Sequence, residues 1–351
     1  MASISSKLSR SVAQPLVVDR TSPIVLWAIA GCLFLAGELY VIGSWVLGPN
    51  FVPTPEGADQ ISDIQRIYFL MLQIGVTGLF LFFAYMWLIK PWLREGRMTS
   101  SGRLFAAGSM LFIYDCSMNY TATVLFYNSH LANFGSWTLG SWPGWLSPMG
   151  NVLPEPIFVS PPGYTTFVLT QAVFVCWLVR KAKTKWPKLG TLSIIGLIVL
   201  GCTIVDSVLE TLLVRSGVYA YPGAIRSLTL FAGETYQFPL YEGLLFGGFG
   251  IGAMAVLNFF RDDKGQTFVE RGVERLRIGE FGKQWLRGLA VYGFCHLMFF
   301  TLYMVPMQWF SLNSDPFPEG YPPSLVNNMC VYGVNADQCP GPGVMIPRLP
   351  K

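Results

Sequence analysis

The chain has 351 residues, of which 52% are hydrophobic and 13% are charged, whereas about a quarter of the residues of an average soluble protein are charged. With a mean hydropathy of +0.45, too little polar surface remains to cover a water-soluble body, so most apolar surface has to face lipid. The net charge of +4 is then a topology signal of loops at one side of a membrane, and a nucleic-acid partner is not expected. Two His and seven Cys without CxxC or HxxxH spacing argue against a metal centre held by the protein.

Seven segments come close to the about 20 apolar residues that a helix needs to cross a bilayer. In chain order they are residues 24–47, 67–89, 104–127, 164–179, 189–214, 238–260 and 288–310. The fourth is short, which implies extension by its neighbours or a thinner environment. The first is too long for a signal-peptide core and lacks a small-residue cleavage site after it, so we expect it to remain as a span. The sequence predicts an all-α polytopic membrane protein, with a seven-helix domain over residues 24–310 between tails of residues 1–23 and 311–351.

Lys and Arg gather in alternate connections. If the N-terminus is cytoplasmic, 19 of the 24 basic residues fall on that side: three in the N-terminal tail, four after the second span, five after the fourth and seven after the sixth. Because cytoplasmic loops hold such an excess, we predict a cytoplasmic N-terminus and an external C-terminus in a bacterial plasma membrane. Residues 266–283 carry Phe268, Val273 and Leu276 among Arg and Glu, a pattern that predicts an amphipathic interfacial helix.

The external side has two features of its own. The connection 128–163 contains no Lys or Arg but three Trp, and we expect it to lie at or dip into the interface. Cys330 and Cys339 lie in the external tail, where an oxidising environment permits a disulfide; the alternative is two free thiols. The other five cysteines fall inside predicted spans and are expected to be small apolar packing residues.

Six ionisable side chains lie inside predicted spans, where each costs about 2.5 to 3.5 kcal/mol on insertion and is a functional-site hypothesis. They are Glu38, Asp115, Asp206, Glu210, Glu242 and His296. Asp206 and Glu210 are four residues apart and share a helix face, as do Asp115 and Asn119. Two carboxyls this close in a low dielectric cannot both ionise readily, so one can act as general acid and the other as base. We therefore predict a catalytic cluster of Asp115, Asn119, Asp206, Glu210 and Glu242.

Other polar residues are candidates for substrate binding. Asn128, His130 and Glu155, the last between two prolines, would roof a cavity whose floor is Asp115, and Glu38 and His296 join this group. Structural alternatives stay open: helix-end capping for Asn128 and His130, a solvated turn for Glu155, a hydrogen-bonded core histidine for His296, and pinning of the bundle for the carboxyls. Small-xxx-small spacing in the sixth span, at Gly243, Gly247, Gly248 and Gly252, predicts close helix packing.

Several runs of residues are distinctive. They are Tyr114-Asp115-Cys116-Ser117-Met118-Asn119-Tyr120, residues 127–137, Pro154-Glu155-Pro156, Asp206 to Pro222, and Tyr236 to Gly243. Together they resemble the avermectin spirocyclase (AveC) family of multi-pass membrane proteins, over roughly residues 24–310. The resemblance implies an enzyme of secondary metabolism that forms a spiroketal from a dihydroxy-ketone polyketide precursor, in some members with dehydration.

The predicted cluster suits that chemistry. Spiroketal formation needs a proton donor to expel water from a hemiketal, an anionic group to steady the oxocarbenium-like ion, and a base for the second hydroxyl. A membrane pocket of carboxyls supplies all three, accepts an apolar small molecule from the lipid bilayer, and needs no redox or nucleotide cofactor. Two alternatives stay open: a transporter, against which the missing inverted repeat argues, and another membrane lipid or terpenoid cyclase or isomerase. A retinal protein is excluded because no predicted span contains Lys.

Overall fold

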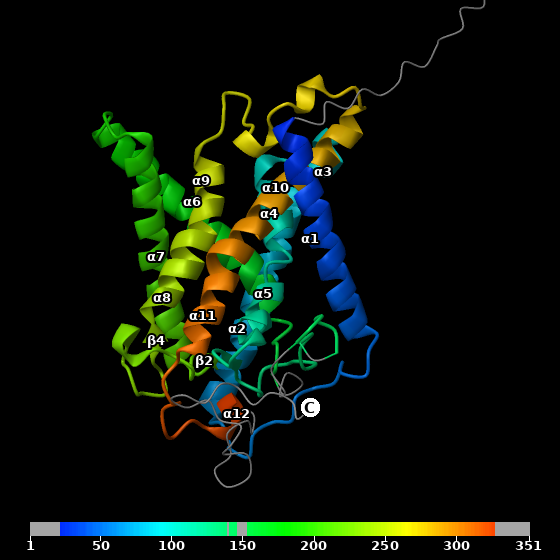
Figure 1. The fold of residues 1–351 in the computed structure, drawn as a ribbon. Helices are drawn as coiled ribbons and strands as arrows, with labels where there is room; N and C mark the ends of the chain where they lie inside the picture. The colour runs from blue at the N-terminus through cyan, green and yellow to red at the C-terminus, as the bar shows by residue number, and fades with distance from the viewer. Residues whose placement is uncertain (1–21, 139, 146–152, 327–351) are drawn as a thin grey trace, which may run out of the picture.

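The computed structural model describes residues 22–138, 140–145 and 153–326. Helices dominate it, and the label η marks 3₁₀- and π-helical segments (Figure 1). The elements are α1 (Pro23–Val46), α2 (Asp63–Ala84), η1 (Tyr85–Ile89), α3 (Lys90–Glu95), α4 (Ser100–Gly108), α5 (Ile113–Ser117), η2 (Met118–Tyr120), β1 (Phe126–Tyr127), α6 (Ser160–Lys185), α7 (Thr191–Arg215), β2 (Tyr219–Ala220), η4 (Arg226–Leu228), β3 (Thr229–Leu230), β4 (Phe238–Pro239), α8 (Leu240–Glu242), η5 (Gly243–Ile251), α9 (Gly252–Phe259), η6 (Phe268–Glu270), η7 (Val273–Arg275), α10 (Glu280–Phe299), η8 (Phe300–Met304), α11 (Val305–Leu312) and α12 (Pro323–Val326).

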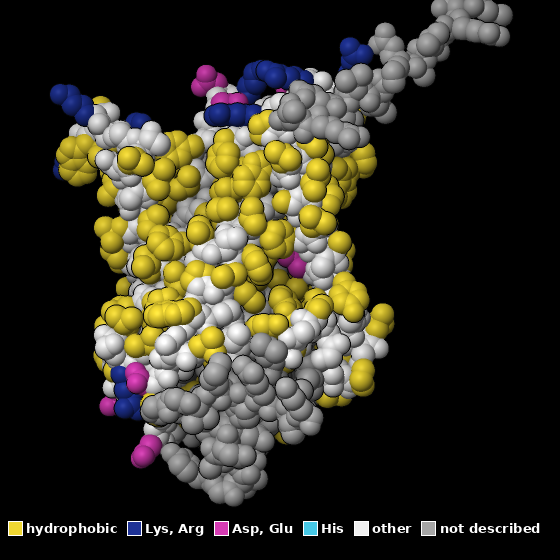
Figure 2. Space-filling model, in the orientation of Figure 1, with side chains coloured by type: hydrophobic (Ala, Val, Ile, Leu, Met, Phe, Trp, Pro, Cys, Tyr) yellow, Lys and Arg dark blue, Asp and Glu magenta, His cyan; other side chains and the backbone are white. Residues whose placement is uncertain are grey.

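Six helical runs among the described residues are long and apolar enough to cross a membrane. They are Pro23–Val46, Asp63–Glu95, Ser160–Lys185, Thr191–Arg215, Leu240–Phe259 and Glu280–Leu312. The expected all-α class is confirmed, and the fourth predicted helix, which looked short, has 26 residues. Figure 2 shows hydrophobic side chains over the middle of the molecule and Lys and Arg gathered at one end, at the top of the view. We call this end the basic end. This apolar surface is that of a membrane protein.

The predicted third helix over residues 104–127 is wrong as a continuous helix. It is divided into α4, the five-residue α5, the single turn η2 and the strand β1. The side chain of Asn119 bridges the last turn, since its Oδ1 accepts from the backbone N–H groups of Val124 at 2.7 Å and Leu125 at 3.0 Å. Non-helical backbone is tolerated at membrane depth where protein buries it, and Asn119 is 1% exposed. The break therefore lies inside the bundle.

The two ends of the described chain lie at opposite ends of the bundle (Figure 1). α1 begins at the basic end, where the N–H of Ile24 donates to the carbonyl of Arg271 at 3.4 Å. α12 lies at the other end, where the N–H of Ser129 donates to the carbonyl of Ser324 at 2.9 Å. Two short antiparallel ribbons, β1 with β2 and β3 with β4, close this second end. They connect the helices that carry the buried carboxyls.

The predicted interfacial helix over residues 266–283 is also wrong. Two 3₁₀ turns, η6 and η7, precede the start of α10 at residue 280. A capping box between Thr267 and Glu270 builds the first turn, and Gly272, at a φ of 92°, turns the chain in a conformation that favours glycine. Val273 is completely buried. This connection packs against α1 and α10, so its apolar residues serve the protein interior.

Cysteine positions agree in part with expectation. Cys116, Cys176, Cys202 and Cys295 are buried, whereas Cys32 is exposed on α1. Cys330 and Cys339, whose disulfide we predicted, lie outside the described residues, and that pairing stays a prediction.

Candidate functional site

A cavity of about 80 Å³ lies inside the bundle, bounded by α5, α6, α7, α8, η5 and η8. Four carboxyl side chains line it: Asp115, Asp206, Glu210 and Glu242. Five tyrosines complete its polar wall: Tyr127, Tyr164, Tyr219, Tyr221 and Tyr303. No Lys, Arg or His is among the described residues that line it. We call these four acids the carboxyl cluster.

Asp115 projects from the short helix α5 and is 2% exposed. Its Oδ2 accepts a hydrogen bond from the hydroxyl of Tyr127 at 2.6 Å and another from Ser160 at 2.9 Å. Ser160 begins α6, so the break after α5 and the start of α6 meet at this carboxyl. Two donors on one oxygen favour the carboxylate form.

Glu155 lies beside Asp115, in the loop before α6, and is completely buried. Its Oε2 accepts from the thiol of Cys116 at 2.8 Å, and its Oε1 has no donor among the described residues. This burial excludes the solvated turn that we weighed for Glu155. Burial, followed by the charge of Asp115, raises the pKa of Glu155 well above its ordinary value.

α7 presents Asp206 and Glu210 to the cavity from successive turns. Asp206 is completely buried; its Oδ1 accepts from Gln171 of α6 at 3.2 Å, and its Oδ2 has no donor among the described residues. Glu210 is half-buried and accepts from the hydroxyl of Tyr221 at 2.6 Å. The glycine face of η5 makes room for this pair, because a Cβ at Gly247 would lie 2.5 Å from the Cβ of Asp206.

Glu242 of α8 faces the same cavity and is 1% exposed. Its Oε1 accepts from the hydroxyl of Tyr303 of η8 at 3.0 Å, and its Oε2 has no donor among the described residues. A buried carboxyl oxygen without a donor is costly unless it carries a proton or meets a polar ligand. Glu242 and Asp206 each present one such oxygen, so the cluster is equipped to hold protons.

Six of the ten predicted site residues do not line this cavity: Asn119, Asn128, His130, Glu155, Glu38 and His296. Asn119 does not lie on one helix face with Asp115, because α5 ends at residue 117, and it braces the following turn instead. Asn128 donates to the carbonyl of Gly217 at 3.0 Å and accepts from the N–H of His130 at 3.0 Å, which is a structural, capping type of role. His130 Nδ1 lies 3.3 Å from the carboxylate of Glu56. Neither Asn119, Asn128 nor His130 lines the cavity.

Glu38 and His296 form a separate pair between α1 and α10. The Nδ1 of His296 lies 2.6 Å from Glu38 Oε1, its Nε2 lies 3.0 Å from the carbonyl oxygen of Ala107, and Tyr292 donates to Glu38. Glu38 lines a different, largely apolar cavity of about 590 Å³, together with Tyr114. The structure therefore does not bring this pair to the carboxyl cluster.

Sequence reasoning missed the tyrosines, which are neutral and give no insertion-cost signal. Tyr219 and Tyr221 are two residues apart after α7, and residues at this spacing in an extended strand point to the same side. In the structure both line the cavity from β2 and the residues after it. The Tyr-x-Tyr spacing is the sequence signal that could have predicted these two tyrosines in the cavity wall.

The fold and site define a class: a polytopic membrane protein with a buried cavity of carboxyls and tyrosines. A family model described as AveC-like spirocyclase matches residues 95–326. The chain belongs to the AveC-like spirocyclase family, as its motifs suggested, and the match includes all four acids of the carboxyl cluster. No curated protein and no solved structure matches the chain.

Proposed function

We propose that this protein is a membrane-embedded spirocyclase-like enzyme that closes a spiroketal by acid–base catalysis at the carboxyl cluster. The supporting observation is the convergence of four acids on one cavity with no cation among its described lining residues. Membership of the AveC-like spirocyclase family suggests the same role. The substrate is an apolar, polyketide or lipid-like dihydroxy ketone.

The reaction balances as the loss of one water. One substrate hydroxyl adds to the ketone carbon and gives a hemiketal. Protonation of the hemiketal hydroxyl breaks its C–O bond, releases water and leaves an oxocarbenium ion. The second hydroxyl then forms the new C–O bond and gives up its proton to a base.

The acids differ in ways that suit these steps. Asp206, fully buried with one oxygen lacking a donor, holds the proton that expels water. Glu210, one turn away and half-buried, takes the proton of the second hydroxyl. Asp115, held as a carboxylate by two donors, stabilises the cation electrostatically. Glu242 and the tyrosine hydroxyls orient the substrate oxygens.

Substrate binding requires the cavity to widen. Its volume of about 80 Å³ is below the roughly 300 Å³ at which ligand pockets begin. Phe167 of α6 and Leu209 and Leu213 of α7 line the cavity and are half-buried. We propose that an apolar substrate enters from the bilayer between α6 and α7 by displacing these three side chains.

A synthetic dihydroxy ketone tests the proposal. Membranes containing the protein should yield a product lighter by one water and enriched in one stereoisomer. The excess of one stereoisomer distinguishes the enzymatic reaction from the spontaneous one. Glu210→Gln and Asp115→Asn should each lower turnover about a hundredfold, the usual worth of a positioned acid or base. Glu234→Gln, at an exposed position outside the cavity, is the matched control. Normal turnover in both cavity variants, or loss of folded protein in place of activity, would contradict the proposal.

A further inference from the structure

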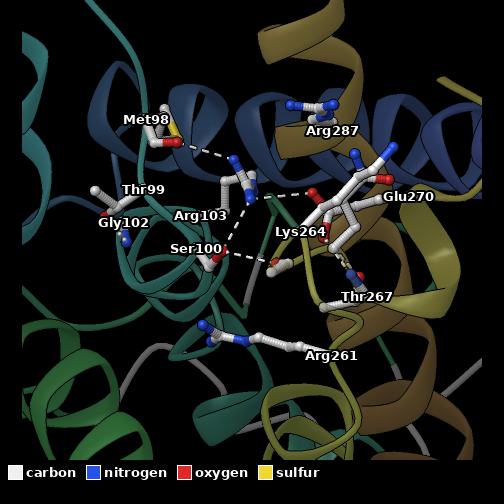
Figure 3. A network of polar contacts seen from close by, with 12 residues as sticks. Met98, Thr99, Ser100, Gly102, Arg103, Arg261, Lys264, Thr267, Glu270 and Arg287 are labelled. Atoms are coloured by element: carbon white, nitrogen blue, oxygen red, sulfur yellow. Dashed lines mark hydrogen bonds and ion pairs between the residues drawn. The ribbon is translucent and has the colours of Figure 1, made fainter. Parts of the chain in front are cut away.

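A polar cavity of about 300 Å³, called the basic cavity here, lies at the basic end of the bundle, apart from the carboxyl cluster. Figure 3 shows four of the cationic side chains that line it, Arg103, Arg261, Lys264 and Arg287, together with Glu270. It is bounded by the start of α4, the α9–η6 connection and the start of α10. Five cationic side chains line it: Arg97, Arg103, Arg261, Lys264 and Arg287. No Asp or Glu of the described residues is among its lining.

The nearby carboxylates neutralise only some of these cations. Arg103 pairs with Glu270 at 3.1 Å, and both side chains are buried, at 6% and 0% exposure. Arg97 pairs with Glu95 at 2.7 Å, and Arg287 pairs at 2.6 Å with a half-exposed carboxylate of η7. Within the described ranges, Arg261 and Lys264 make no ion pair. The cavity therefore keeps an excess of positive charge.

Three guanidinium groups also have hydrogen-bonding capacity left. The Nε–H groups of Arg103, Arg261 and Arg287 are buried and have no acceptor among the described residues. Burial lowers the pKa of Arg103, Glu270 opposes this effect, and the neighbouring Arg287 and Arg261 lower the pKa further. An anion between these side chains would relieve their mutual repulsion and give each unpaired donor an acceptor.

The first turn of α4 adds neutral donors on one side of the basic cavity. Thr99 is the N-cap of this nine-residue helix, and Thr99, Ser100 and Ser101 all line the cavity. The hydroxyls of Thr99 and Ser100 already donate to the carbonyls of Trp87 at 3.2 Å and Gly265 at 3.1 Å, so the donors offered here are the backbone N–H groups of the first turn. Free N–H groups and the helix dipole favour an anion at such a terminus. Guanidinium forks match the oxygens of a phosphate particularly well. This donor set fits a phosphate group.

An apolar cavity of about 200 Å³ adjoins the basic cavity. The two share Met98 and Gln284 in their linings, and the apolar cavity continues along Leu35 of α1 and Leu289 of α10. Trp285, which also lines it, is 53% exposed, as is typical of an aromatic side chain at a membrane interface. A polar site for phosphate thus continues into an apolar slot at one surface of the membrane.

We propose that the two cavities together bind an anionic phospholipid, with its phosphate in the basic cavity and the first part of an acyl chain in the apolar cavity. The apolar continuation favours a lipid over a free phosphate. The site is distinct from the carboxyl cluster and does not depend on the proposed reaction.

Lipid titrations of the full chain in an uncharged detergent test the proposal, with native mass spectrometry and thermal unfolding as readouts. Phosphatidylglycerol should bind at least about tenfold more tightly than phosphatidylcholine. The double variant Arg261→Gln/Lys264→Gln should lower that affinity about tenfold. Lys183→Gln/Lys185→Gln removes two exposed charges of α6 outside the cavity and should leave the affinity for phosphatidylglycerol unchanged. Equal binding of the two lipids, or equal effects of the two double variants, would overturn the proposal.

A second variant distinguishes a lipid from free phosphate. Gly288 lines the apolar cavity, and an added Cβ there would meet no atom within 4 Å. Gly288→Leu should therefore fill the slot without disturbing the fold, weaken phosphatidylglycerol binding and leave binding of glycerol 3-phosphate unchanged. If inorganic phosphate binds as tightly as phosphatidylglycerol and Gly288→Leu has no effect, the site takes a soluble anion and the lipid assignment is wrong.

Discussion

Gly247→Ala tests whether the packing of η5 against α7 positions Asp206. An added Cβ would lie 2.5 Å from the Cβ and 2.9 Å from the Cγ of Asp206. These atoms are close to the backbone, so either the two helices separate or the Asp206 side chain leaves its place. Overpacking of this kind costs about 1 to 3 kcal/mol, and the better helix propensity of Ala returns up to about 1 kcal/mol. We expect a net loss of about 1 to 2 kcal/mol in the free energy of unfolding, together with reduced turnover.

Gly252→Ala is the matched control on the same helical run. Its added Cβ would meet its nearest atoms, on Val199 of α7, at 3.7 Å, an ordinary contact. Thermal unfolding in detergent and stereoisomer-resolved turnover of the dihydroxy ketone are measured for both variants. Gly252→Ala should turn over like the wild type and be as stable as the wild type or up to about 1 kcal/mol more stable. Wild-type stability and turnover in Gly247→Ala would refute the inference that this contact places Asp206.

Three further predictions concern the pH dependence, the topology and the tail. Burial raises the pKa of Glu155 in the folded state above its ordinary value of 4.5, so the thermal midpoint should fall as pH rises above about 4.5 and this carboxyl loses its proton. Glu155→Gln should flatten this slope, and an unchanged slope would contradict the assignment to Glu155. A cysteine at Lys185 should react with a membrane-impermeant maleimide only from the cytoplasmic side and one at Glu234 only from outside, with the unsubstituted chain as control; reaction of both from one side would overturn the topology. Peptide mapping without reduction should find Cys330 joined to Cys339, and two free thiols would exclude that bond.

The long apolar helices could be predicted from the sequence, but the break in residues 104–127 could not. Hydropathy averages over a window and does not register contacts that satisfy the backbone from elsewhere. Here the backbone after α5 depends on the carboxamide of Asn119 and on Gln308 of α11, which accepts from the N–H of Thr121 at 3.2 Å. The sequence pattern predicts that Asn119 is a partner of Asp115, whereas in the structure Asn119 supports an irregular turn.

The acids of the site could be predicted because burying a carboxyl is costly, and that cost is visible at each residue separately. Which acids share a cavity depends on packing between distant helices. Glu242 meets Asp206 because the glycines of η5 allow a close approach to α7. Glu38 has the same insertion cost and was equally a candidate by that criterion, but it is paired with His296 on the other side of α5. Insertion cost therefore identifies candidates, and helix contacts select among them.

The break in the third segment also explains how one bundle holds two unlike cavities. Tyr114 and Asp115 are consecutive in α5, yet Tyr114 lines the cavity of about 590 Å³ that contains Glu38, and Asp115 lines the cavity of the carboxyl cluster. A continuous apolar helix would pack along its length against its neighbours, and the start of α6 would then not reach Asp115. Because the chain turns after α5, Ser160 at the start of α6 reaches Asp115 and donates to it. The irregular segment is thus the element that ties the loop with Glu155, the start of α6 and the carboxyl cluster into one site.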